Sequence, residues 1–102
     1  MTTGTGESIR VDLWLWYARV FKTRTRCALQ VSAGKVRVGG TRIQKPSHRV
    51  VPGDVLTVVA GRDVRVLEVL ALGSRRGPAV ESRTLYREIP ARPSPGTEVT
   101  SN

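Results

Sequence analysis

The sequence predicts an α+β fold in which two N-terminal helices, arranged as a helix-turn-helix, pack on a small antiparallel sheet. Apolar residues recur with helical spacing in residues 12–33, and the pattern changes to alternation in the segments that follow. The 102 residues are enough for one domain with one modest core. Helices first and strands after is an order typical of α+β proteins.

Residues 12–21 are expected to form the first helix. Asp12 stands in its first turn, where a negative charge suits the helix dipole. The expected apolar stripe follows positions i, i+3, i+4, i+7 and i+8, namely Leu13, Trp16, Tyr17, Val20 and Phe21, widened by Trp14 and Ala18. Core packing is favoured for Trp16. Trp14 is left open between packing in the core and stacking on a base.

A second helix is expected over about residues 24–33. Thr23 suits the N-cap, and Gly34 suits the residue that follows the last turn. Only two or three residues separate the two helices, so they must turn sharply on each other. We interpret Cys27 as a small core residue rather than a nucleophile, because no general base lies near it in the sequence.

Residues 36–43 predict a β-hairpin around the turn Gly39-Gly40. A two-residue turn pairs Val38 with Thr41, Arg37 with Arg42, and Val36 with Ile43. The apolar members then share the core face, and Lys35, Arg37 and Arg42 share the other face. A Pro-Gly-Asp turn and a Gly-Arg-Asp turn each lead into one further strand.

The chain is expected to divide into four segments. Residues 1–8 are predicted to be flexible, and residues 9–72 to form the domain. Residues 73–88 are expected to form an arm or a short helix. Residues 89–102 contain three prolines and no apolar pattern, which predicts a disordered tail.

The charge is concentrated in one part of the chain. The net charge is +9, and the stretch from Arg10 to Arg49 holds ten Lys and Arg residues opposed only by Asp12. The rest of the chain sums to zero. This asymmetry indicates a polyanion as partner. A single cysteine, no apolar run of about 18 residues and no secretory signal together predict a cytoplasmic protein without a membrane span.

Two local rules are broken within the basic stretch. Arg24 and Arg26 stand at the start of a helix, where the dipole disfavours cations, and Arg37 faces Arg42 across the hairpin. Uncompensated repulsion of this kind is typical of a site whose anion is absent. The alternative of a generally solvated basic surface is disfavoured by the neutral second half of the chain.

No catalytic, metal or cofactor site is expected. His48 is the sole histidine, and no cysteine pair or carboxylate cluster accompanies it. The acidic residues are scattered, and the Gly-Gly turn is not a phosphate-binding loop. The sequence therefore predicts a protein that is not an enzyme and needs no cofactor.

Over about residues 10–59, the chain resembles the S-four RNA-binding domain, also called the αL motif. The resemblance lies in the order of elements: a helix, a basic helix, a G-[KR]-V-x-V-x-G hairpin and a P-G-D turn. "DLWLWYARVFKTRT", "KPS" and "RRGPAVESRTLYRE" are similar to the family of the ribosome-associated fifteen-kilodalton heat-shock protein. This resemblance implies binding of structured RNA, in particular rRNA of the large ribosomal subunit. It also implies a role in recycling stalled subunits that carry a nascent chain on tRNA.

Position by position, the resemblance implies an RNA-binding face, to which the charge argument adds three arginines. The resemblance contributes Arg10, Lys22, Thr23, Arg24, Lys35, Arg37, Gly40, Lys45 and Ser47, and the charge argument contributes Arg19, Arg26 and Arg42. The chain departs from the family at the turn, where Gly39-Gly40 replaces Asn-Gly, and at Gln30, where an apolar residue is usual. It also lacks a longer Lys-rich C-terminal helix.

Two other functions remain open at this point. The chain is alternatively a DNA-binding helix-turn-helix module, or a basic adaptor for acidic proteins or membrane surfaces. A DNA reader should carry side chains such as Asn or Gln on its second helix, whereas this helix offers Gln30 and mostly Ala, Ser and Val, which disfavours a DNA reader. We expect a monomer that binds RNA and no small-molecule substrate.

Overall fold

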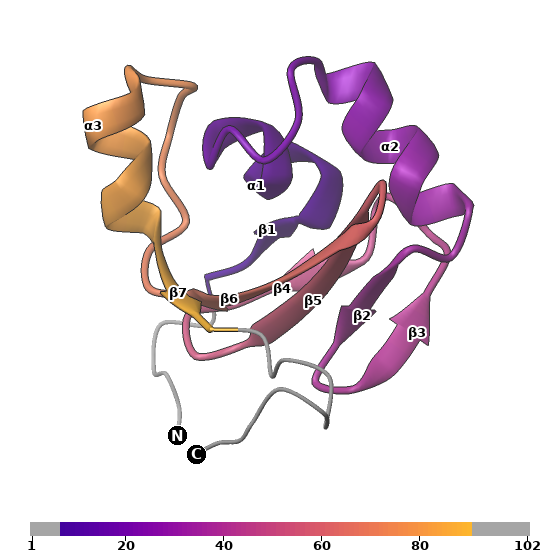
Figure 1. Ribbon diagram of the computed structural model, residues 1–102. Helices are drawn as coiled ribbons and strands as arrows, with labels where there is room; N and C mark the ends of the chain where they lie inside the picture. The colour runs from indigo at the N-terminus through magenta and orange to yellow at the C-terminus, as the bar shows by residue number, and fades with distance from the viewer. Residues whose placement is uncertain (1–6, 91–102) are drawn as a thin grey trace.

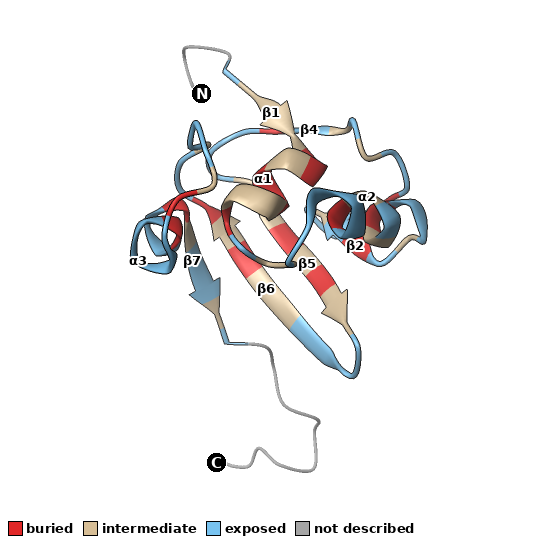
Figure 2. Ribbon diagram, turned by 90° about the horizontal axis from the view of Figure 1, so that it is seen from above, coloured by how far each residue is buried: buried red, intermediate tan, exposed pale blue. Residues whose placement is uncertain are grey.

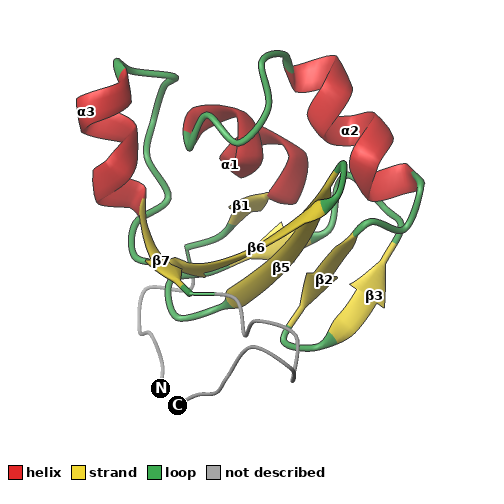
Figure 3. Ribbon diagram, viewed as in Figure 1, coloured by secondary structure: helices red, strands yellow, loops and turns green. Residues whose placement is uncertain are grey.

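A curved five-stranded sheet carries the helices on one of its faces (Figure 1, Figure 3). The structure, a computed structural model, describes residues 7–90. Its helical segments are α1 (Val11–Tyr17), α2 (Arg24–Ser32), α3 (Ala79–Ser82) and a 3-10 turn η1 (Arg83–Leu85). Its strands are β1 (Ile9–Arg10), β2 (Val36–Val38), β3 (Thr41–Ile43), β4 (Arg49–Val50), β5 (Val55–Ala60), β6 (Asp63–Val69) and β7 (Tyr86–Ile89).

The strands form two antiparallel sheets. The larger has the order β3-β2-β5-β6-β7, and β1 pairs with β4 in a separate two-stranded sheet. The α+β class predicted from the sequence is confirmed. Buried residues gather where α1 and α2 lie over β2, β5 and β6 (Figure 2). Leu56, Val58 and Leu67 alternate with less buried neighbours, as expected for a sheet with one face on the core.

The first helix is shorter than predicted, and its most buried face differs from the main predicted stripe, of which Trp16, Tyr17, Val20 and Phe21 pack against the core but are only partly buried. It ends at Tyr17, because Ala18 caps it and Arg19 has a left-handed backbone with φ 60°. The fully or almost fully buried apolar residues are Val11, Trp14, Leu15 and Ala18. This stripe has the same helical spacing as the predicted one. Because the segment is apolar around most of its circumference, its periodicity could not choose between the two stripes.

Trp14, rather than Trp16, is the core tryptophan. Its side chain has no exposed surface, and its Nε1 donates a hydrogen bond to the carbonyl of Ala71 at 2.9 Å. The ring meets Tyr86 edge to face, with the centroids 6.4 Å apart. Trp16 is only partly buried. The open question about Trp14 is therefore answered by packing in the core.

The second helix and the hairpin match their predictions. Thr23 caps α2, and its Oγ1 accepts a hydrogen bond from the backbone N–H of Arg26 at 3.0 Å. Gly34 follows the helix with φ 77°, a conformation that favours glycine. The three predicted hairpin pairs occur in the predicted register. Both turn glycines also have positive φ.

The C-terminal part of the described chain returns to the sheet. Residues 73–88, for which an arm or a short helix was expected, contain the four-residue α3 and most of β7, a strand that the sequence did not reveal. Ile89, assigned to the tail from the sequence, pairs with Val66 of β6. The strand is short and carries charged residues, and its pairing is with a distant segment, so local pattern did not show it. Residues 91–102 of the predicted tail and residues 1–6 of the predicted flexible start lie outside the described residues.

Candidate nucleic-acid interface

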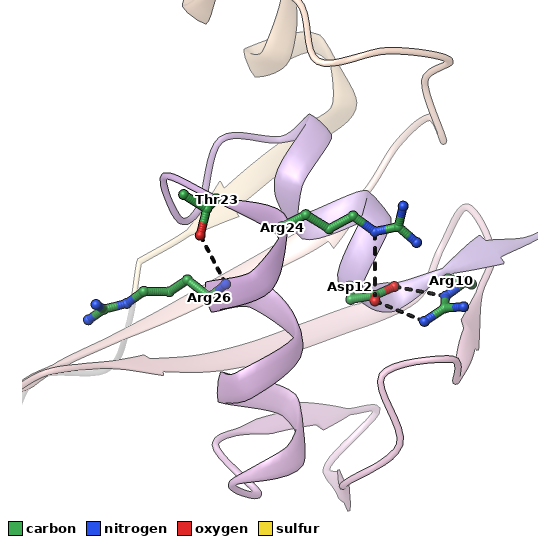
Figure 4. Close-up of polar contacts among 5 residues, drawn as sticks. All are labelled: Arg10, Asp12, Thr23, Arg24 and Arg26. Atoms are coloured by element: carbon green, nitrogen blue, oxygen red, sulfur yellow. Dashed lines mark hydrogen bonds and ion pairs between the residues drawn. The ribbon is translucent and has the colours of Figure 1, made fainter.

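The start of α2 directs its two arginines to opposite sides. Successive helical residues are about 100° apart, so residues two apart point in nearly opposite directions. Figure 4 shows the Arg24 side chain extending toward Asp12 of α1, while the Arg26 side chain extends away on the other side. The predicted interface residues around this helix start therefore belong to two separate groups.

The first group, the Asp12 cluster, consists of Arg10, Asp12 and Arg24. Asp12 is 2% exposed and accepts two hydrogen bonds from Arg10, from Nε at 3.1 Å and from a terminal nitrogen at 3.0 Å. The hydrogen bond with Asp12 raises the pKa of Arg10. Arg24 lies farther away, with its Nε 3.9 Å from the carboxylate. The cations here are partly compensated, which corrects the expectation of unopposed charge.

Two further predicted residues lie beside this cluster on the loop between β3 and β4. Backbone hydrogen bonds hold the loop against the start of α1, because Asp12 N donates to Pro46 O at 3.3 Å and Val11 N donates to His48 O at 2.7 Å. Lys45 and Ser47 are exposed on this loop. The structure thus places residues far from Arg10 in sequence next to it in space.

The second group lines a groove between the α1–α2 connection and the loop before α3. This basic groove has a volume of about 690 Å³ and is lined by Arg19, Val20, Phe21, Lys22, Thr23, Arg26 and Arg76. Four of these side chains are cationic, and none is acidic. Sequence reasoning missed Arg76, because the second half of the chain has no net charge and gave no signal at this position.

The third group is the β2–β3 hairpin, which follows the other end of α2. Arg37 and Arg42 form a cross-strand pair, and both are exposed, as is Lys35. The Arg42 side chain passes over Gly34, where its Cδ would lie 3.2 Å from an added Cβ. Gly40 is exposed at the hairpin turn with φ 87°. The hairpin and the start of α2 lie at opposite ends of the helix, so the predicted residues form a track rather than one compact patch (Figure 1).

The structure shows which Lys and Arg side chains have a carboxylate partner and which do not. In the second half of the chain, Arg65 pairs with Glu88 at 2.9 Å, Arg75 with Glu81 at 2.8 Å and Arg87 with Glu68 at 2.6 Å. Within residues 7–90, seven cations of the predicted interface have no carboxylate partner: Arg19, Lys22, Arg26, Lys35, Arg37, Arg42 and Lys45. Cations without a carboxylate partner are therefore most numerous around α2, its flanks and the hairpin, while Arg62, Arg76 and Arg83 are further examples in the second half of the described chain.

The described residues show no arrangement suited to metal chemistry. No group of three His, Cys, Asp or Glu side chains between residues 7 and 90 could hold a metal ion. Cys27 is fully buried, and burial raises its pKa to about 11. Over the same range, no helix has the length and apolar character that crossing a bilayer requires.

Comparison with known proteins assigns the first part of the chain to a domain family. The S4 domain, the S-four domain of the sequence resemblance, matches residues 9–56. Arg76 and the segment that returns to the sheet lie outside this match.

Full-length relatives and a solved structure extend the similarity. The chain is 38% identical over 87 residues to Heat shock protein 15 homolog of Aeromonas salmonicida, and 41% identical over 80 residues to Heat shock protein 15 of Escherichia coli K12. These matches cover 85% and 78% of the chain, but only 65% and 59% of those proteins. A trimeric structure of Vibrio cholerae Heat Shock Protein 15 superposes with a TM-score of 0.76 at 38% identity, covering 81% of the chain and 83% of that structure.

Proposed function

Because the chain belongs to the heat shock protein 15 family of S4-domain proteins, we propose that it is a non-catalytic protein that binds structured RNA. The supporting observation is the distribution of unpaired cations. A folded protein with both signs of charge normally disperses them, whereas this chain pairs Arg65, Arg75 and Arg87 with carboxylates and leaves most cations around α2 and the hairpin without one. RNA phosphates supply the missing anions.

The geometry favours an extended partner over a small anion. The unpaired cations run from the start of α2 to the hairpin at its other end, a helix length of about 13 Å for nine residues. A phosphate backbone presents charges at regular intervals along such a track. The exposed positions of α2 include Arg24 and Arg26 but no Asn or Gln, and arginines can bind phosphates, which suits recognition of backbone and shape.

The partner we propose is rRNA of the large ribosomal subunit. The corresponding role is recycling of stalled subunits that carry a nascent chain on tRNA, in the cytoplasm. Each proposed contact lies on a single chain, so we propose that a monomer suffices for binding. Light scattering of the complex measures this stoichiometry directly.

A competition experiment tests the proposal against its alternatives. Labelled large-subunit rRNA fragments are challenged with duplex DNA and with anionic phospholipid vesicles at physiological salt. We expect rRNA fragments to compete best, with an affinity that falls steeply with salt. If duplex DNA or vesicles displace the RNA instead, RNA binding is the wrong function.

Sedimentation tests the ribosomal part of the proposal separately. In lysate separated at low salt, we expect the protein to migrate with free large subunits. Recovery only in the ribosome-free fractions would contradict a ribosomal partner while leaving RNA binding intact.

A further inference from the structure

The basic groove includes one cation that the S4 domain does not supply. Arg76 lies beyond the matched residues 9–56, yet it lines the same groove as Lys22, Thr23 and Arg26 of the domain. The neighbouring Arg75 is paired with Glu81, 2.8 Å away. The loop therefore separates its two adjacent arginines, one neutralised on the outside and one facing the domain.

Two reciprocal hydrogen bonds hold Arg76 in place. Arg76 Nε donates to the carbonyl of Trp16 at 3.2 Å, and Arg19 Nε donates to the carbonyl of Gly77 at 2.7 Å. The Arg76 guanidinium also lies 5.8 Å from the centroid of the Trp16 ring. These contacts fasten the loop to the end of α1, so both guanidiniums are positioned before any ligand arrives.

Both guanidiniums donate hydrogen bonds through Nε alone. Among residues 7–90, the terminal nitrogens of Arg19 and Arg76 have no hydrogen-bond partner, and the side chains of Lys22 and Arg26 have none either. Terminal guanidinium nitrogens form the fork that matches two oxygens of a phosphate. Four cations around one groove repel one another, and an anion placed between them relieves that repulsion.

From this arrangement we propose that the basic groove binds a phosphodiester of the RNA, with Arg76 and Arg26 as ligands contributed by different parts of the chain. The proposal rests on RNA binding as the function. The loop before α3 thereby becomes part of the RNA-binding surface. It enlarges that surface from the helix and hairpin of the S4 domain to the segment that follows it.

The test compares Arg76→Gln with Arg83→Gln in the full chain, using the large-subunit rRNA fragment that the unaltered protein binds most tightly. Each variant removes one arginine, and Arg83 is exposed, outside the groove and without a side-chain partner within the described residues. We expect Arg76→Gln to raise Kd about tenfold, as for loss of one charge-assisted contact. The slope of log K against log salt should fall by about 0.7 to 0.9, and Arg83→Gln should change Kd by less than about twofold.

A double-mutant cycle distinguishes a ligand from a structural support. If Arg76 and Arg26 hold the same phosphate, Arg26→Gln should cost clearly less in the Arg76→Gln background than in the unaltered protein. Additive losses would overturn the proposal. If Arg76→Gln does not fold, the cycle is run with Arg76→Lys, which keeps the charge but lacks the fork, and the same comparison applies.

The outcomes separate this proposal from the function on which it rests. Absence of RNA binding by the unaltered chain would overturn both. Strong, salt-dependent binding by the unaltered chain, with Arg76→Gln equal to Arg83→Gln, would overturn only the phosphate site in the groove.

Discussion

Replacing Arg10 and Arg24 one at a time should separate stability from RNA affinity. Both arginines approach Asp12, but Arg10 makes two hydrogen bonds with it, at 3.1 and 3.0 Å, whereas Arg24 remains 3.9 Å away. The Asp12 side chain is 3% exposed, so it depends on its partners for solvation. We therefore expect Arg10→Ala to destabilise the free protein and Arg24→Ala to weaken binding.

The magnitudes follow from these contacts. Loss of the Arg10 hydrogen bonds leaves a buried carboxylate poorly solvated and should lower the free energy of unfolding by about 2 kcal/mol. The melting temperature should then fall by roughly 8–16 °C. For Arg24→Ala, loss of a long and half-exposed ion pair costs about 0.5 kcal/mol. Removing a cation from the start of a helix returns a similar amount, so the net change should stay within about 0.5 kcal/mol.

Urea denaturation of the free protein and RNA titrations at several salt concentrations measure both effects. Arg24→Ala should weaken RNA binding by about 1–3 kcal/mol and reduce the salt slope by about 0.7 to 0.9. Arg83→Ala provides the matched control, with little effect on either quantity. Equal destabilisation by Arg10→Ala and Arg24→Ala would refute the separation, because Arg24 would then be a structural partner of Asp12. Unchanged RNA affinity in Arg24→Ala would show that this side of α2 is only a solvated surface.

Two substitutions and one labelling experiment test other parts of the structure. Arg37→Thr should raise the free energy of unfolding by a few tenths of a kcal/mol, because it relieves repulsion from Arg42, and it should weaken RNA binding in the same titrations. Trp14→Phe should lower the free energy of unfolding by about 2–3 kcal/mol, because it removes the hydrogen bond to Ala71 and leaves a cavity; an unchanged urea midpoint would contradict this. Cys27 should resist iodoacetamide until the protein unfolds, and stability should fall from about pH 9 to about pH 11, where the exposed thiol of the unfolded chain ionises before the buried one.

The parts of the fold that were predicted correctly depend on local chemistry. A capping hydroxyl at Thr23 and a glycine at position 34 bound α2, and the Gly39-Gly40 turn determines the hairpin register. The prediction for α1 gave Trp14 and Ala18 correctly but did not identify the most buried face, because apolar residues surround most of the helix. The pairs β1–β4 and β6–β7 are short and join distant segments, so no local pattern predicts them.

The candidate site likewise has features that the sequence predicts and features that depend on contacts between distant residues. The concentration of charge in residues 10–49 predicts an RNA-binding role for the residues around α2 and the hairpin, and this role remains a prediction. A count along the chain includes the charge of Asp12 but could not show that Asp12 pairs with Arg10. Nor could it show that Glu81 pairs with Arg75 and so leaves Arg76 open. Side-chain geometry decides which cation remains available to bind an anion, whereas the sequence shows only the number of charges of each sign.

β3 is an edge strand, and its position means that the arginines of the hairpin also affect self-association of the protein. β3 lies at one end of the five-stranded sheet, so one side of its backbone has no partner strand within residues 7–90. Such an edge is a template for pairing with another chain. β3 has only three residues, and two copies meeting edge to edge would bring Arg42 and the adjacent Arg37 of each against those of the other. We therefore expect the charges proposed to attract RNA also to oppose this contact between copies, so that neutralising both arginines should favour aggregation as well as weaken binding of the nucleic acid.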